Sequence, residues 1–337
     1  MILRMLASLA LIAALTAPAA AQDRVTVGTV RQPNNGPLFL ADAAGYFTAE
    51  GLDVEMKAYS TSTAVAEALA GGALDFGLMD FSAEAFNLAG TGVIKAIAAQ
   101  AREKRDVEGN DLVVSLGAFS AGVRKPENLR DRSIGITSLG SIFHYQAAEI
   151  AKAKDIDFAT IKLRPMLTYE AVAQAIADGQ IDAAILPPQY ARNLILSGLG
   201  RVMSWCSDFG EEQLGALFVA TKVVTARRAA VAKLVRAYRR GAADYAAGLA
   251  RYDRFRKPIS DKKSRAVAAT IARYIYPGQP LPGSIAAVEL GALYIDPQVR
   301  LDAADIARQI SWFKSQKLVE SSVDPHKIVD LSFADGH

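Results

Sequence analysis

The sequence predicts a two-lobed α/β fold in which each lobe is a mostly parallel sheet flanked by helices, and two hinge strands join the lobes. An internal repeat is the first observation: AVAEALAGGALD at 64–75 and AVAQAIADGQID at 171–182 agree at seven of twelve positions. A short apolar run follows each copy, FGLM and AAIL. An Ala-rich helix that ends at a glycine and leads into a buried strand therefore occurs twice. Strand-like and helix-like segments also alternate along the chain, which favours parallel sheets with right-handed crossovers.

The elements of the first lobe follow one another without a break. RVTVGTV at 24–30 alternates in polarity and predicts the first strand. The turn-forming RQPNNG follows at 31–36, and a helix then begins at Pro37 and ends near Gly45 or Gly51. The alternation continues with a strand over 52–60, a helix capped by a hydroxyl of 60–63, a strand over 74–80, a helix from 81, and a strand over 93–101.

The second lobe repeats this scheme. It is predicted to contain a strand over 133–137, a helix over 138–155, a strand over 160–166, a helix over 169–179, a strand over 181–187 and a further helix after it. Two apolar runs, 111–119 and 214–224, lie outside the alternation and are interpreted as paired hinge strands. The mostly helical remainder from Thr225 is expected to complete the first lobe. Lobe I is therefore predicted over 22–117 plus 208–337, and lobe II over 118–207.

The first 21 residues have the features of a cleaved secretory signal peptide. Arg4 supplies the positive charge, 5–16 the apolar segment, and 19–21 an A-x-A cleavage site. The apolar segment is shorter than the roughly 20 residues that a membrane-spanning helix requires. We therefore expect a mature chain that starts at Gln22 and resides in the periplasm.

Composition excludes several function classes. The formal charge of the whole chain is only +3, and its basic residues form no run beyond one solvated helix face, so nucleic acid is not an expected partner. A single cysteine, Cys206, allows no internal disulfide and is expected to be a packed small residue. Three widely spaced histidines do not form a metal site. No metal and no cofactor are predicted, and a monomer is expected.

Several phrases resemble one known family. GYFTAEGLDVEM at 45–56, ALAGGALDFGLMD at 68–80, GVIKAIAA at 92–99 and PENLRDRSIGITSLGS at 126–141 are similar to the type II periplasmic solute-binding proteins of the alkanesulfonate, taurine, nitrate and thiamine-precursor branch, called NMT1/THI5-like or SsuA-like. The resemblance extends from about residue 24 to 320. It implies delivery of a small solute to the membrane subunits of an ABC importer, and it leaves the ligand open.

Ligands of open α/β sheets bind outside the carboxyl ends of the strands. Two sheets that face each other place those ends around one cleft, so the loops after the strands supply the candidate ligand-binding residues. They are Gln32, Asn34, Asn35, Ser60, Thr61, Asp80 and Phe81 in the first lobe, and Ser138, Gly140, Ser141, His144, Gln189 and Tyr190 in the second.

Each candidate also has a purely structural interpretation. The loop 138–141 precedes a helix, where free N–H groups favour an anion, but Ser138 also fits as the helix cap. Asp80 ends a buried strand, so its carboxylate either holds an amine or hydroxyl of the ligand or caps a helix. The amides of 32–35 also fit an ordinary turn. Phe81, Phe143, His144 and Tyr190 can wall a flat ligand or pack in the core.

The expected ligand loops contain no Arg or Lys apart from Arg31 at their edge. Arg is the usual clamp for carboxylates and sulfonates, so its absence favours a larger organic solute over a compact oxyanion such as nitrate. An aromatic or heterocyclic solute and a sulfonate are both left open as that solute. Two alternatives to transport remain open. The chain can serve a membrane receptor as a sensing subunit, or it can be an enzyme like the thiamine-pyrimidine synthases of this family, whose Cys-rich motif it lacks.

Overall fold

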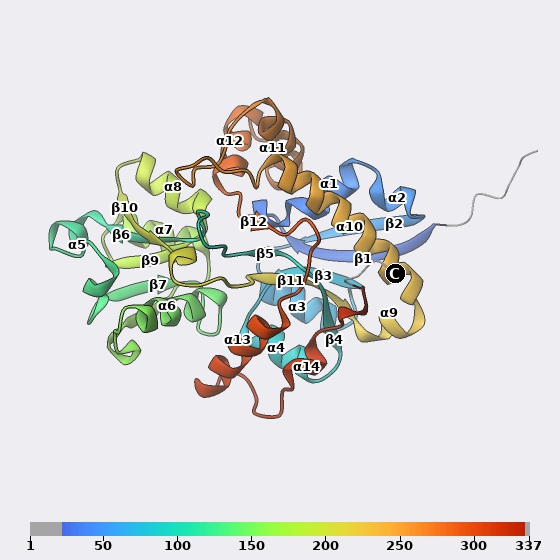
Figure 1. Ribbon diagram of the computed structural model, residues 1–337, viewed down its shortest axis with the longest axis horizontal. Helices are drawn as coiled ribbons and strands as arrows, with labels where there is room; N and C mark the ends of the chain where they lie inside the picture. The colour runs from blue at the N-terminus through green and yellow to red at the C-terminus, as the bar shows by residue number, and fades with distance from the viewer. Residues whose placement is uncertain (1–21, 334–337) are drawn as a thin grey trace, which may run out of the picture.

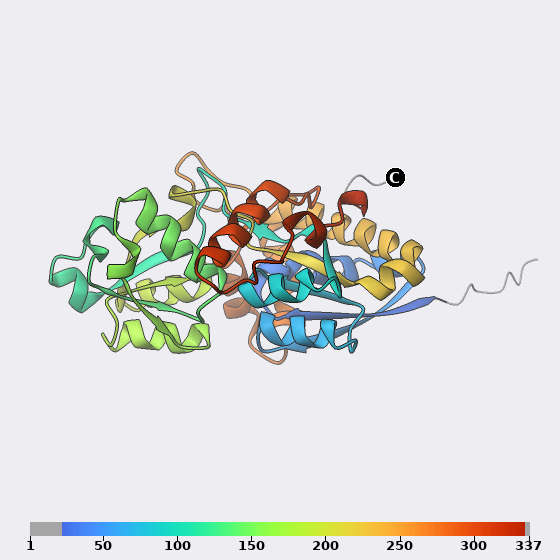
Figure 2. The ribbon, with the colours of Figure 1, turned by 90° about the horizontal axis from the view of Figure 1, so that it is seen from below.

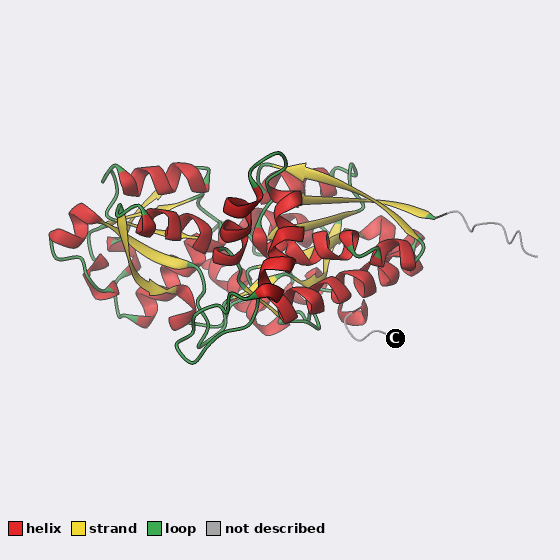
Figure 3. Ribbon diagram, turned by 90° about the horizontal axis from the view of Figure 1, so that it is seen from above, coloured by secondary structure: helices red, strands yellow, loops and turns green. Residues whose placement is uncertain are grey.

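Each lobe is built around a five-stranded sheet in which four strands point one way and one runs against them. The computed structural model describes residues 22–333, and the predicted signal peptide at 1–21 lies outside them. The lobes lie side by side, with helices flanking each sheet (Figures 1 and 3). The predicted fold class is therefore confirmed.

The first sheet has the strand order β2-β1-β3-β11-β4. Its strands are β1 (Asp23–Val30), β2 (Leu52–Tyr59), β3 (Phe76–Asp80), β4 (Ile94–Ala99) and β11 (Gly215–Ala220), and its connecting helices are α1 (Gly36–Ala43), α2 (Tyr46–Ala49), α3 (Ser62–Ala70) and α4 (Ala83–Gly90). The single helix expected from Pro37 is two helices, because Gly45 adopts a left-handed φ of 69° between them.

The second sheet has the order β10-β6-β9-β7-β8. Its strands are β6 (Asp111–Ser115), β7 (Ser133–Ile136), β8 (Lys162–Pro165), β9 (Ala183–Leu186) and β10 (Gly200–Trp205), and its helices are α5 (Leu116–Ser120), α6 (Ile142–Ala153), α7 (Tyr169–Ala177) and α8 (Pro188–Leu196). Read from its other edge, this order matches the order of the first sheet. The two lobes are therefore built on the same plan, as the sequence repeat predicted.

The two apolar runs outside the alternation are β6 and β11, the antiparallel strand of each sheet. We expected these two strands to pair with each other, and this prediction is wrong. β6 lies between β9 and β10 in the second sheet, whereas β11 lies between β3 and β4 in the first. The extended segments that cross between the lobes precede these strands. Residues 101–103 and 212–214 run side by side there, and Glu103 N donates to Glu212 O at 2.7 Å. The cause is that a strand buried on both faces has the same apolar sequence whether it joins two lobes or lies in the middle of one sheet.

The aspartate shared by the two repeats has the same task in each lobe. In the first lobe, Asp75 Oδ2 accepts from Thr26 N at 3.0 Å, and Asp75 N donates to Thr26 Oγ1 at 2.9 Å. In the second, Asp182 Oδ2 accepts from Ser133 N at 2.8 Å, and Asp182 N donates to Ser133 Oγ at 2.9 Å. Each aspartate therefore joins the turn before its strand to the first strand of the same lobe.

The chain after Thr225 is mostly helical and packs largely on the first lobe (Figure 1). Its longest helix, α10, lies against α1, and a Cβ added at Gly241 would stand 2.1 Å from Pro37 O, so this close contact requires glycine. The remaining elements are β5 (Ala101–Arg102), α9 (Thr221–Ala226), α10 (Arg228–Gly248), α11 (Lys262–Ile275), α12 (Leu281–Leu290), β12 (Tyr294–Ile295), α13 (Ala303–Ser315) and α14 (Pro325–Ile328), with short 3-10 turns at Pro33–Asn35, Pro126–Leu129, Phe158–Thr160, Cys206–Asp208 and Leu331–Phe333.

One tail helix also reaches the second lobe. Trp312 on α13 makes edge contacts with His144 and Tyr145 of α6, at ring-centroid distances of 4.9 and 5.5 Å. Figure 2 shows the red helix α13 beside the green second lobe. The lobes therefore contact each other through the tail as well as through the two crossings. Within residues 22–333, no helix is long and apolar enough to cross a membrane.

Candidate functional site

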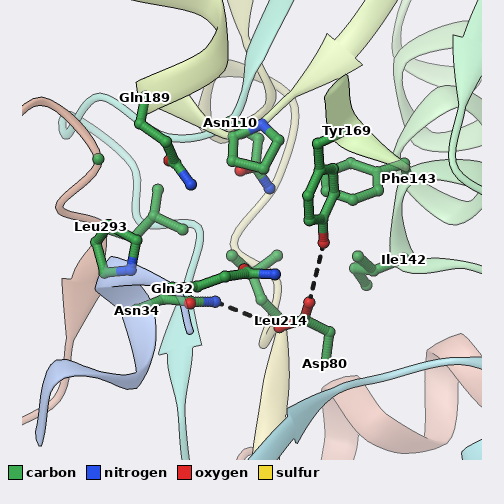
Figure 4. Close-up of a pocket in the computed structure, with 13 residues that line it drawn as sticks. Gln32, Asn34, Asp80, Asn110, Ile142, Phe143, Tyr169, Gln189, Leu214 and Leu293 are labelled. Atoms are coloured by element: carbon green, nitrogen blue, oxygen red, sulfur yellow. Dashed lines mark hydrogen bonds between the residues drawn. The ribbon is translucent and has the colours of Figure 1, made fainter. Parts of the chain in front are cut away.

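A small cavity lies between the two sheets, where the strands of both lobes end (Figure 4). Residues from the first lobe, the second lobe and the tail line it: Gln32, Pro33, Asn34, Asp80, Asn110, Ile142, Phe143, Tyr169, Pro187, Gln189, Leu214, Gly291 and Leu293. The free space for the centre of a water-sized sphere is about 10 Å³. This is close to the room that one water molecule needs, so the lobes are nearly closed on each other.

Asp80 connects the two lobes across this cavity. It is the last residue of β3, where its N–H donates to Ser62 Oγ at 3.1 Å. Its Oδ1 accepts from Asn34 Nδ2 at 3.3 Å, and its Oδ2 accepts from the Tyr169 hydroxyl at 3.3 Å (Figure 4). Asn34 belongs to the first lobe and Tyr169 begins α7 of the second, so the carboxylate joins groups from both.

The cavity wall has an acid and no base. Asp80 is the only carboxylic acid among the thirteen lining residues, and none of them is Arg, Lys or His. Burial raises the pKa of the Asp80 carboxyl above its ordinary value, and hydrogen bonds from neighbours such as Tyr169 and Asn34 offset only part of this shift. Burial also raises the pKa of Tyr169 well above its ordinary value, so its hydroxyl stays protonated as a donor at neutral pH.

Two buried amide oxygens in the cavity wall have no hydrogen-bond partner among the described residues. They are Asn34 Oδ1 and Gln189 Oε1, on residues that are 7% and 8% exposed. The orientation of the Asn34 amide follows from its contact with Asp80, since only its nitrogen can donate to the carboxylate. A buried acceptor without a donor is costly, so these oxygens are free to receive a donor from a bound molecule.

Aromatic rings form one wall of the cavity. Phe143 contacts Tyr169 edge to face with ring centroids 5.6 Å apart, and Tyr190 lies 5.3 Å from Tyr169. The Tyr190 hydroxyl donates to Glu170 Oε1 at 2.7 Å within the same lobe, which fixes that ring beside Tyr169. Two rings of its own lobe therefore hold Tyr169, and Asp80 holds its hydroxyl from the first lobe.

The lobes also meet through their backbones beside the cavity. Ala83 N, at the start of α4, donates to Gly140 O at 2.8 Å, and Ser82 pairs with Ser141. Gly140 has a φ of 85°, and a Cβ there would lie 3.1 Å from the Ala83 Cβ. Glycine at 140 therefore allows both the turn and the close approach of the lobes.

The cavity contains four of the residues that the sequence proposed for ligand binding: Gln32, Asn34, Asp80 and Gln189. Of the two interpretations of Asp80, the helix cap is wrong, because Ser82 Oγ accepts from Ala85 N and caps α4 instead. The other nine candidates do not line the cavity.

Four of these nine lie in the first lobe, and three of them have structural contacts. Asn35 binds Val30 O and Gln100, Thr61 caps α3 by accepting from Ala64 N, and Ser60 is exposed at the surface. Phe81 is 1% exposed and packs against Phe86 and Phe218. Phe81 is thus a core residue, because its side chain points to the face of the sheet that α4 covers.

The five candidates of the second lobe lie near the start of α6 or beside Tyr169. The helix begins at Ile142, later than predicted, and Ser141 is its cap rather than Ser138, whose carbonyl accepts from Ser141 Oγ. Gly140 N donates to His144 Nδ1 at 3.0 Å, and the His144 ring lies against Phe158 and Trp312. Tyr190 supports Tyr169 from behind. The polar groups at the start of α6 thus form hydrogen bonds largely with one another.

Sequence reasoning missed Tyr169, although the repeat contained a signal for it. With the offset of 107 residues between the copies, Tyr169 corresponds to Ser62. Both residues form a hydrogen bond with Asp80, Ser62 through the Asp80 N–H and Tyr169 through its carboxylate. Asn110, Gly291 and Leu293 carried no such signal, because they belong to a crossing and to the tail. In the described part of the chain, no group of His, Cys, Asp and Glu could hold a metal ion.

A model of the family described as NMT1/THI5 like matches residues 32–248, more than half of the chain. The chain belongs to this family. No curated protein matches the sequence. Solved structures share the fold at low identity. The aliphatic sulphonate binding protein SsuA of Escherichia coli has a TM-score of 0.70 and 15% identity, over 91% of this chain and 92% of that one.

Two further structures extend the comparison of this NMT1/THI5-like chain. The alkanesulfonate-binding protein SsuA of Xanthomonas axonopodis pv. citri, bound to MOPS, has a TM-score of 0.67 and 17% identity, over 93% of this chain and 100% of that one. The desulfurization enzyme DSZB has a TM-score of 0.60 and 15% identity, over 93% and 98%. Binding proteins and an enzyme therefore share this fold, so the site must decide between them.

Proposed function

We propose that this chain is the periplasmic solute-binding component of an ABC importer and captures a small organic solute between its lobes. The observation that carries the proposal is the Asp80–Tyr169 contact, which spans the lobes across a cavity with unpartnered amide oxygens. Such contacts exist only when the lobes are closed. A solute that forms hydrogen bonds with the groups of both lobes around this cavity favours the closed form.

The mechanism is hinge closure. The adjacent crossings at 101–103 and 212–214 are the only extended segments that join the lobe sheets within the described residues, so they are the natural hinge. The contacts of Ala83 with Gly140 and of Asp80 with Tyr169 form on the side where the lobes meet. The closed shape is then what the permease recognises.

Family membership, the structural likeness to periplasmic binding proteins and the predicted signal peptide support the periplasmic location and the permease partner. A sensing role at a membrane receptor would use the same closure, and a permease and an ATPase encoded beside this gene would favour transport.

We propose binding rather than turnover. The lining residues include no Ser, Thr, Cys, His or Lys, so the cavity lacks the usual nucleophiles and an imidazole base. Cys206 is 1% exposed, and burial raises the pKa of its thiol well above the ordinary value. The similarity to DSZB is therefore a likeness of fold.

The proposal can be tested on the mature chain. Protein purified without unfolding would be denatured to release and identify its bound compound by mass spectrometry. That compound would then be returned to refolded, ligand-free protein. We expect a smaller radius of gyration in solution scattering, a higher melting temperature and unchanged compound after incubation. Conversion of the compound would contradict the binding role, and unchanged dimensions would contradict closure.

A further inference from the structure

Asp80 and Asn34 offer acceptors to a ligand in the cavity, and this inference about ligand class rests on the proposed function. Both carboxylate oxygens of Asp80 are acceptors, each using one of its lone-pair directions for a donor from the protein. Asn34 Oδ1 has no partner at all. Asp80 and Asn34 lie next to each other, with the Asn34 nitrogen facing the carboxylate (Figure 4). Their acceptors therefore belong to the same part of the cavity wall.

No positive group balances this surface from the cavity wall. None of the lining residues is Lys, Arg or His, and Asp80 is partly enclosed by protein. An anionic group of the ligand placed about 4 Å from the carboxylate would meet a repulsion equivalent to about a thousandfold loss of affinity. A donor at the same place would gain a charge-assisted hydrogen bond.

We infer that the ligand presents N–H donors of an amidine, amide or amine to Asp80 and Asn34, and that Asp80 excludes sulfonates and other oxyanions. The apolar part of the ligand would lie along Phe143, Ile142 and Leu293. The raised pKa of Asp80 agrees with this arrangement, since a donor would stabilise a carboxylate that burial destabilises. The chain would then differ in ligand class from the sulfonate-binding proteins that share its fold.

The test compares matched donors and acceptors on ligand-free, refolded mature protein. Acetamidine and benzamidine supply N–H donors, whereas methanesulfonate and benzenesulfonate supply an oxyanion on the same carbon groups. Melting temperature and calorimetry would be measured for the wild type, Asp80→Asn and Asp53→Asn. Asp53 is an exposed residue near the start of β2, away from the strand ends at the cavity, so its substitution removes the same charge without touching the site.

We expect an amidine to raise the melting temperature and the sulfonates to leave it unchanged. Asp80→Asn should weaken amidine binding by about ten- to a hundredfold, as expected for loss of a hydrogen bond to a charged group, and Asp53→Asn should not. Sulfonate binding by the wild type, or amidine binding unaffected by Asp80→Asn, would overturn the inference and leave the proposed function intact.

The compound that copurifies with the protein provides a second measurement. An amine, amide or amidine would support the inference, and a sulfonate, carboxylate or phosphate without such a donor would overturn it. If neither a probe nor any copurified compound binds, the proposed function itself fails, and the inference about the ligand falls with it.

Discussion

Replacement of Tyr169 by Phe should open the protein without disturbing its fold. The substitution keeps the ring, and with it the edge contact to Phe143 at 5.6 Å and the contact to Tyr190 at 5.3 Å. It removes only the hydroxyl, which donates to Asp80 Oδ2 at 3.3 Å from the opposite lobe. The closed form therefore loses a hydrogen bond that the open form never makes.

The magnitude follows from the geometry of this bond. Hydrogen bonds to charged groups contribute about 1.5–3 kcal/mol, and the 3.3 Å separation places this one at the lower end, about 1.5 kcal/mol. A change of 1.4 kcal/mol is tenfold in an equilibrium constant, so the closed-to-open ratio should fall about tenfold. The apparent affinity for the ligand should fall by up to the same factor, because it scales with the closed fraction.

Tyr190→Phe is the matched control. It removes the same atom from a neighbouring ring, but the hydroxyl of Tyr190 donates to Glu170 within the second lobe. Calorimetry with the copurified compound and solution scattering of the ligand-free protein would compare the two variants. Equal affinities and equal radii of gyration for Tyr169→Phe and Tyr190→Phe would refute the role of the Asp80–Tyr169 contact in closure.

Three further predictions concern the half-buried Asp182 and two buried groups. Hydrogen bonds from Ser133 and the charge of Arg132 outweigh burial and lower the pKa of Asp182, so this stabilisation is present above pH 4 and is lost as the pH falls through the lower folded pKa. Asp182→Asn should reduce the free energy of unfolding by about 1 kcal/mol at pH 7 and by progressively less as the pH falls below 4, measured by urea denaturation. Burial raises the pKa of Asp111 to about 8, and neither of its oxygens has a hydrogen-bond partner within 22–333. The stabilisation by its neutral form is therefore complete below about pH 4, the ordinary pKa of an aspartate, and is lost as the pH rises to 8. Asp111→Asn should raise the urea midpoint more at pH 9 than at pH 5, and equal effects at both would contradict this. Cys206 should resist a thiol reagent at pH 8 until the protein unfolds, and fast labelling of native protein would show that it is accessible.

The helix–turn–strand units could be predicted because their signals are local. Gly72 and Gly179 take φ values of 81° and 68°, which is the reason for glycine at the end of each repeat helix. Thr61 and Thr168 cap the helices that begin there. These roles depend on backbone groups within a few residues, so the sequence already contains them.

The candidate site was predictable only in part. The rule that ligands bind at strand ends located Gln32, Asn34, Asp80 and Gln189 at the cavity. It also selected hydroxyls such as Thr61 and Ser141, which cap their own helices in the structure. A hydroxyl at a helix start has two uses, and nothing in the local sequence decides between them.

The two-lobed plan, the repeat and the acid at the end of β3 can be predicted from the amino-acid sequence alone. The placement of β6 and β11 in different sheets, and the contact of Asp80 with Tyr169, 89 residues further along the chain, depend on the packing of the whole chain. This packing also brings Gly291 and Leu293 of the tail to the cavity. The physical reason is that propensity, capping and periodicity act over a few residues, whereas partners across two lobes are set by how the packed surfaces fit.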